Sequence, residues 1–122
     1  LEKEQAMSAI GSRDLLADER TLYAEIVRRI VAAADPEQII VFGSRARGDH
    51  RPDSDFDILV VKETSEPRYM RSRALYGALA DLPVEVDVSV YTPQEIAAWR
   101  GVRQAFTTTA TREGKVIYER AA

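Results

Sequence analysis

The sequence contains no cysteine and only one histidine among its 122 residues. The absence of cysteine excludes a disulfide framework and any metal site built from thiolates. No apolar run is long enough to cross a membrane, and no basic-then-apolar signal segment opens the sequence, so we expect no membrane association and a cytoplasmic location. The net charge of −3 argues against broad, unspecific binding of nucleic acid.

The composition that remains is typical of a globular protein, with 45% hydrophobic and 30% charged residues. The length fits one domain, which we expect to span residues 1–122. Residues 1–12 are polar without a clear period, and the sequence starts with leucine rather than methionine. We therefore expect them to be a flexible or artificial end, with Met7 as an alternative natural start.

Three segments carry the pattern of helices. Apolar residues recur about every four positions through the first two segments, and the third begins with Thr92-Pro93-Gln94-Glu95, which is typical of a capping box with proline in the first turn. Asp35-Pro36 is expected to end the first helix, because the residue before a proline is driven out of the helical conformation. The predicted helices are Asp14–Ala34, Arg68–Leu82 and Thr92 to about Arg100.

Four segments are predicted as strands. Val84–Tyr91 alternates strictly between valine and more polar residues, which indicates a strand with one buried face. The others are short apolar runs, and Thr107–Thr111 is expected to be irregular. The predicted strands are Glu37–Phe42, Asp55–Lys62, Val84–Tyr91 and Lys115–Tyr118. This order of elements predicts an α/β sandwich with a small mixed sheet and helices packed on it.

The stretch VFGSRARGDHRPDSDFDILVV, residues 41–61, organises the sequence. Gly43 permits a tight turn, and Ser44 can offer its hydroxyl and backbone N–H to a phosphate. Asp55 and Asp57 lie two positions apart on one strand, so their carboxylates share a face and repel each other. Turn or capping roles are the plainer interpretation of these aspartates. Their link to Gly43-Ser44 favours a site for Mg²⁺, which prefers carboxylate and phosphate oxygens. The combination suggests phosphoryl or nucleotidyl transfer.

Asp87 lies on the polar face of the valine-rich strand. If that strand neighbours the one carrying Asp55 and Asp57, three carboxylates meet on one surface of the sheet. Such a set can hold two Mg²⁺ ions and stabilise both the attacking and the leaving oxygen of an in-line displacement. Glu85 shares the face of Asp87, so the sequence leaves open which of the two would be the ligand.

These residues resemble the signature of the DNA polymerase β-type nucleotidyltransferase superfamily, in which Gly-Ser is followed after ten residues by Asp-x-Asp. Here the signature is Gly43-Ser44, residues 45–54 and Asp55-Phe56-Asp57, with Asp87 matching the third acidic residue in a later valine-rich strand. The likeness extends over nearly the whole chain and is greatest to the minimal nucleotidyltransferases. It implies the polymerase β-like fold.

The resemblance also implies roles. Gly43 and Ser44 would hold the triphosphate of the incoming nucleotide, Asp55 and Asp57 would bind both metal ions, and Asp87 would bind the catalytic one. Minimal members are often encoded beside a HEPN-domain protein and act as the antitoxin of a toxin–antitoxin pair. Members of that group are understood to transfer AMP from ATP to a tyrosine of the HEPN ribonuclease toxin. A hetero-oligomer with such a toxin is therefore the expected partnership.

Several positions keep two interpretations. Arg45 and Arg47 are either solvated loop charges or cations that hold the triphosphate, and Arg45 is the better candidate because it follows Ser44 directly. The tyrosines at 69, 76, 91 and 118 are expected to be packing residues. Two other functions also remain open: an antitoxin that acts by binding and occlusion without catalysis, and nucleotidyl transfer to a small molecule such as an aminoglycoside. The small size of the chain favours a protein acceptor.

Overall fold

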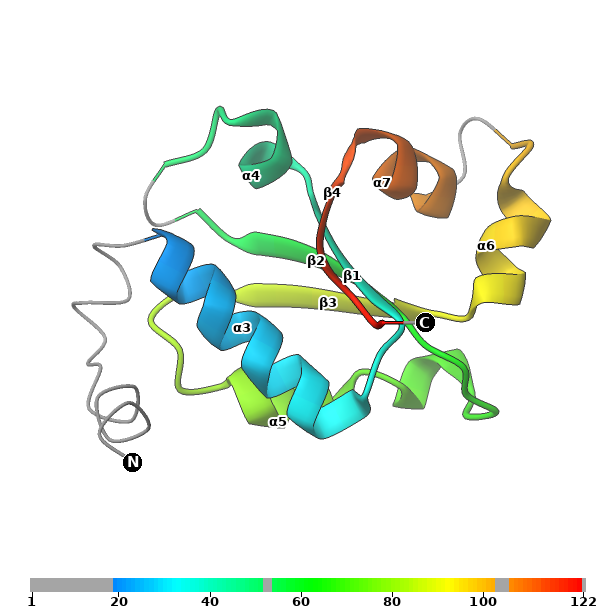
Figure 1. The fold of residues 1–122 in the computed structure, drawn as a ribbon, viewed down its shortest axis with the longest axis horizontal. Coiled ribbons are helices and arrows are strands. Elements are labelled where there is room, and N and C mark those ends of the chain that lie inside the picture. Colours follow the sequence, from blue (N-terminus) through cyan, green and yellow to red (C-terminus); the bar gives the residue numbers. More distant parts are fainter. Residues whose placement is uncertain (1–18, 52–53, 103–105, 122) are drawn as a thin grey trace.

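The computed structural model describes residues 19–51, 54–102 and 106–121, which form a four-stranded mixed sheet between two layers of helices (Figure 1). Helices α3 and α5 cover one face of the sheet, and α4 and α7 lie over the other. This confirms the predicted α/β class. The elements are α3 Glu19–Ala34, β1 Gln38–Phe42, α4 Ser44–Arg47, β2 Phe56–Val61, the 3₁₀ turn η1 Arg68–Met70, α5 Arg73–Leu79, β3 Val86–Tyr91, α6 Pro93–Trp99, α7 Phe106–Glu113 and β4 Lys115–Glu119.

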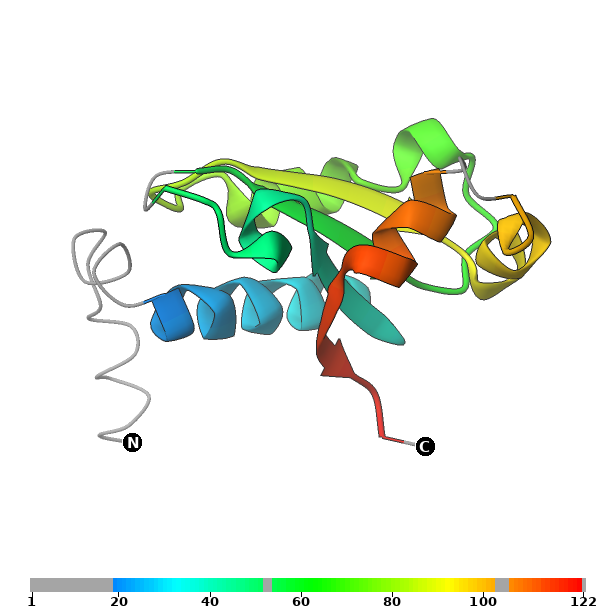
Figure 2. The same ribbon diagram turned by 90° about the horizontal axis from the view of Figure 1, so that it is seen from above.

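The strand order is β3-β2-β1-β4, so β3 and β4 form the two edges of the sheet (Figure 2). Strand β1 is antiparallel to both β2 and β4. Strands β2 and β3 are parallel. A parallel pair needs a crossover connection, and here η1 and α5 supply it between the two strands. The crossover brings the starts of β2 and β3, which carry the candidate carboxylates, to the same end of the sheet.

The position of each strand explains its sequence pattern. Strands β1 and β2 are central and covered on both faces, so they read as nearly continuous apolar runs. Strand β3 is an edge strand, and its valines alternate with exposed or half-buried residues. The strict alternation of the sequence therefore predicted β3 well, although the strand begins at Val86 rather than at Val84.

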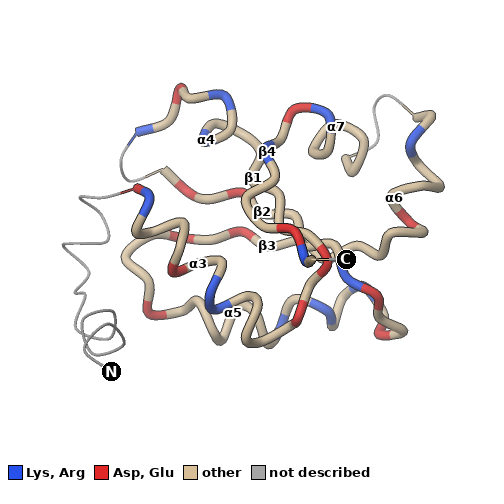
Figure 3. The backbone as a smooth tube through the Cα atoms, in the orientation of Figure 1, with Lys and Arg blue, Asp and Glu red and all other residues tan. Residues whose placement is uncertain are grey.

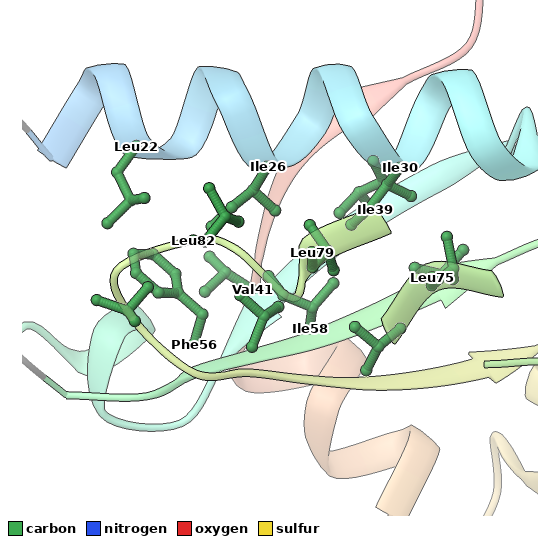
Figure 4. Packing of buried hydrophobic residues seen from close by; sticks show 14 of the residues in the cluster. Leu22, Ile26, Ile30, Ile39, Val41, Phe56, Ile58, Leu75, Leu79 and Leu82 are labelled. Atoms are coloured by element: carbon green, nitrogen blue, oxygen red, sulfur yellow. The ribbon is translucent and has the colours of Figure 1, made fainter. Parts of the chain in front are cut away.

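The main core lies between α3, α5 and one face of the sheet (Figure 4). Leu22, Ile26 and Ile30 of α3 point at the sheet, because residues four apart share one face of a helix. Each is almost completely buried, which stabilises the fold by about 1.5–3 kcal/mol per side chain before the cost of ordering it. A second, smaller cluster lies on the opposite face, around Leu59 of β2 and Ala110 of α7.

Two predictions about helices are wrong. The segment expected as one helix from Arg68 to Leu82 contains the 3₁₀ turn η1 and then the shorter α5. Thr107–Thr111, expected to be irregular, lies within α7. The other helix signals are confirmed: α3 ends at Ala34 before Asp35-Pro36, and Thr92 caps α6 in a capping box with Glu95. Residues 14–18 of the first predicted helix lie outside the described residues. Of the helices in the described part of the chain, none is both long and apolar enough to span a membrane.

Candidate active site

Asp57 and Asp87 are direct neighbours across the parallel pair of strands. The register aligns the Cα of Asp57 in β2 with that of Asp87 in β3, and aligns Phe42 of β1 with Asp57 on the other side. Both carboxylates belong to the sheet face opposite the main core, because Phe56 and Ile58 on either side of Asp57 are buried in that core. Asp87, rather than Glu85, therefore stands opposite Asp57. The acidic segments of β2 and β3 lie side by side in Figure 3.

Asp55 lies just outside β2 and is exposed. Its place is fixed by the next residue, because the backbone N–H of Phe56 donates to the carbonyl oxygen of Glu85 at 2.9 Å. The start of β2 is thereby bonded to the residue before β3. Asp55 and Glu85 consequently occupy the same end of the sheet as the Asp57–Asp87 pair.

The electrostatics of Asp57 show that negative charge is concentrated here. Partial burial raises the pKa of the Asp57 carboxyl, the charges of Asp87 and Asp55 raise it further, and Arg47 opposes them. A cation that enters the site would therefore stabilise the ionised form of the Asp57 carboxylate. Among residues 19–51, 54–102 and 106–121, however, no three acidic or histidine side chains already converge as a metal-binding group. The donor chemistry fits Mg²⁺, which takes few protein carboxylates and completes its shell with water and phosphate oxygens.

Gly43 places the backbone directly against Asp57. Its φ of 71° and ψ of −150° lie in a region that is essentially restricted to glycine. A Cβ atom at this position would collide with Oδ2 of Asp57 and lie 3.3 Å from its Cγ. Only glycine therefore allows the turn and the carboxylate to meet. Ser44 follows at once and begins α4.

Arg45 and Arg47 lie in different environments. Arg45 is buried: its guanidinium stacks on the ring of Phe56 at 3.9 Å and donates to the carbonyl oxygen of Ser54 at 2.7 Å. Its Nη1 also lies 3.8 Å from Oε1 of Glu19. The side chain thus braces the loop against the core. Arg47 is exposed, and its Nε lies 3.2 Å from Oδ2 of Asp49. Its positive charge lowers the pKa of Asp57. Arg47 is consequently the more available cation, the reverse of the ranking that the sequence suggested.

Tyr76 of α5 is the residue that sequence reasoning missed. Its hydroxyl donates to Oδ1 of Asp87 at 3.0 Å and accepts the backbone N–H of Val88 at 3.1 Å. The side chain is 42% exposed, so its role is more than packing, contrary to the sequence-based prediction. The hydrogen bonds reach over the outer edge of β3 and orient the Asp87 carboxylate. No sequence signal marks which strand a helical tyrosine will reach.

The chain resembles known nucleotidyltransferases in sequence and in fold. Residues 22–110 match the family model described as "Nucleotidyltransferase domain". A candidate nucleotidyltransferase from Sulfolobus solfataricus superposes with a TM-score of 0.60 at 21% identity, covering 92% of each chain. A candidate minimal nucleotidyltransferase gives 0.50 at 27% identity, covering 82% of this chain and 93% of the other.

A third similar structure is described as a toxin–antitoxin with AMP-PNP. It gives a TM-score of 0.52 at 21% identity, covering 80% of this chain and 73% of the other. No curated protein sequence is significantly similar to this chain. The family match covers most of the chain, including Gly43, Ser44 and all three candidate aspartates. Together with the shared fold, it shows that the chain belongs to the nucleotidyltransferase domain family.

Proposed function

We propose that this protein transfers AMP from ATP to a hydroxyl group of a partner protein in a Mg²⁺-dependent reaction. The observation that carries the proposal is the position of Asp57. Its carboxylate meets the backbone of Gly43 on one side and aligns with Asp87 on the other. A turn able to receive phosphates and a set of acidic ligands thus share one surface, which is the arrangement that nucleotidyl transfer requires.

The residues take the following roles in this proposal. Gly43 and Ser44 hold the triphosphate, with Arg47 as the nearby cation. Asp55 and Asp57 would hold the two Mg²⁺ ions, and Asp87 would contribute a further ligand to one of them. Bound Mg²⁺ supplies positive charge that neutralises phosphate oxygens and makes the attacking hydroxyl more acidic. Tyr76 holds the carboxylate of Asp87 in place through its hydrogen bond.

The reaction is an in-line displacement at the α-phosphorus of ATP. The acceptor oxygen forms a bond to that phosphorus, while the bond to the oxygen that bridges to the β-phosphate breaks. Pyrophosphate leaves with the electron pair, and the proton of the acceptor hydroxyl passes to solvent. The chain contributes mainly by positioning the groups and by balancing charge, as in other phosphoryl-group transfers.

The proposed acceptor is a tyrosine of a cognate HEPN ribonuclease toxin, bound in a hetero-oligomer. The likeness to a structure described as a toxin–antitoxin with AMP-PNP supports a toxin partner and an adenine nucleotide. The protein would then act as an antitoxin that silences its partner by chemical modification.

Replacing Asp57 with asparagine separates this mechanism from occlusion. The variant keeps the size of the side chain but removes the charge on which metal binding depends. We expect co-expression of this variant with the proposed toxin partner to remain toxic, while purification still shows the two proteins bound together. Glu113→Gln, at the exposed end of α7, is the matched control and should neutralise normally. Full neutralisation by Asp57→Asn would instead show that binding alone suffices.

A further inference from the structure

A cavity of about 580 Å³ opens beside the candidate carboxylates, between α5 and the start of β3. One wall is apolar and contains Leu79, Leu82 and Val84. These side chains also belong to the main core, so the wall is held in a fixed shape. A cavity of this size, with an apolar wall and a few polar groups, is typical of a binding site for a small group or a side chain.

Every charged residue in the described lining of this cavity is acidic. Asp55, Glu85 and Asp87 line it, and no Lys, Arg or His is among the described residues that do so. A nucleoside triphosphate, which is itself anionic, is disfavoured by such a lining. The proposed metal ions would neutralise Asp55 and Asp87 but leave the charge of Glu85. The lining therefore suits an uncharged group that arrives together with a cation.

The cavity borders Asp87 at the outer edge of the sheet, on the side of the Asp57–Asp87 pair that is away from Gly43. Gly43 meets Asp57, and Asp57 aligns with Asp87 on the next strand. Asp87 in turn lines the cavity, at the outer edge of the sheet. The triphosphate turn and the cavity thus lie on opposite sides of the Asp57–Asp87 pair. In-line displacement places the attacking oxygen opposite the leaving group. With the triphosphate at Gly43, a hydroxyl that attacks from the side of Asp87 would approach over the outer edge of β3, where the cavity opens.

We infer that this cavity is the acceptor site, that it takes the phenol side chain of a tyrosine from a basic segment, and that Glu85 selects the positive charge beside that tyrosine. The inference rests on the proposed function and makes its substrate more specific. A phenol ring matches the apolar wall, whereas an aminoglycoside has cations but little apolar surface. Glu85 is exposed at the rim, and its backbone is fixed by the bond to Phe56.

Binding of three fluorescein-labelled peptides tests the inference without any need for catalysis. Each has a central tyrosine flanked on both sides by arginine, glutamine or glutamate, and is titrated by fluorescence anisotropy with Mg²⁺ and an ATP analogue that cannot be cleaved at the α-phosphorus. An exposed ion pair contributes up to about 1 kcal/mol. A change from attraction to repulsion at Glu85 therefore predicts a preference for the arginine over the glutamate peptide of roughly tenfold.

The variants Glu85→Lys and Glu85→Gln should remove this preference, with the lysine variant reversing it and the glutamine variant intermediate. Glu113→Lys changes the net charge equally but lies on α7, and should keep the wild-type preference. Thermal unfolding of each variant shows whether it is folded. The inference is overturned if no peptide binds, if all three bind equally, or if Glu113→Lys has as large an effect as Glu85→Lys.

Label transfer from ATP distinguishes this inference from the proposed function. If α-phosphate label is transferred to all three peptides alike, and Glu85→Lys does not alter the pattern, nucleotidyl transfer stands and the charge-selective acceptor site is overturned. If the arginine peptide binds preferentially through Glu85 but no label reaches it, the acidic cavity is supported and the proposed chemistry is contradicted.

Discussion

Replacing Gly43 with alanine should damage the site far more than the fold. The new Cβ would collide with Oδ2 of Asp57, where ordinary contacts begin near 3.4 Å, so the carboxylate must move by about 1 Å or the turn must change. A displacement of that size at reacting groups can cost about 100-fold in rate. Alanine is also strained at a φ of 71° and ψ of −150°, by about 1–3 kcal/mol.

Gly48→Ala is the matched control for this prediction. Gly48 also has a positive φ, 82°, but a Cβ there would have no neighbour within 4 Å. The Gly48→Ala variant should lose about 1 kcal/mol of stability through backbone strain alone. For a chain of this length, that loss lowers the midpoint of thermal unfolding by about 4 °C. The assays are thermal unfolding and transfer of α-phosphate label. If Gly43→Ala transfers label as fast as Gly48→Ala, contact between the turn and Asp57 is not what the reaction needs.

Three further predictions concern other contacts. Tyr76→Phe should lower kcat by roughly 10-fold with little change in KM for ATP, because it frees the Asp87 carboxylate that Tyr76 orients. A tenfold rise in KM with an unchanged kcat would contradict this prediction. Gly114→Ala should destabilise the fold by about 1–3 kcal/mol in urea titrations, because its Cβ would lie 2.6 Å from Cγ2 of Ile40. Hydrogen bonds from Arg28 and then Arg29 lower the pKa of Glu25 from 4.5 to about 2, so its contribution to stability is complete above pH 4.5 and lost as the pH falls toward 2. Glu25→Gln should be less stable than wild type at pH 7 and equal to it near pH 2.

The strands β1, β2 and β3 could be predicted because their buried positions are apolar, which gives continuous or alternating apolar patterns in the sequence. The threonine-rich α7 was not, because β-branched residues have low helix propensity. Burial of Thr107 and Ala110 against the sheet outweighs that preference. The split before α5 has a similar tertiary cause, since Arg71 donates to Glu95 at 2.7 Å and is held near α6.

For the candidate site, the sequence nominated residues but could not predict how they pair. A shift of two residues between parallel strands keeps every side chain on the same face, so the sequence could not choose between Glu85 and Asp87 opposite Asp57. Arg45 and Arg47 were ranked by distance along the chain, whereas α4 turns each residue by about 100° and directs Arg45 into the core. The contact between Tyr76 and Asp87 depends on how α5 packs beside β3, which the sequence alone does not predict.

Transfer of label from ATP to the proposed toxin partner tests the central claim most directly. The purified protein and the toxin are incubated with Mg²⁺ and ATP labelled at the α-phosphate or, in a parallel reaction, at the γ-phosphate. Stable label on the toxin from the α position only, absent when both Asp55 and Asp57 are replaced by asparagine, is the predicted result. Label from the γ position would contradict nucleotidyl transfer in favour of a kinase, and no label despite tight binding would favour an antitoxin that acts by occlusion.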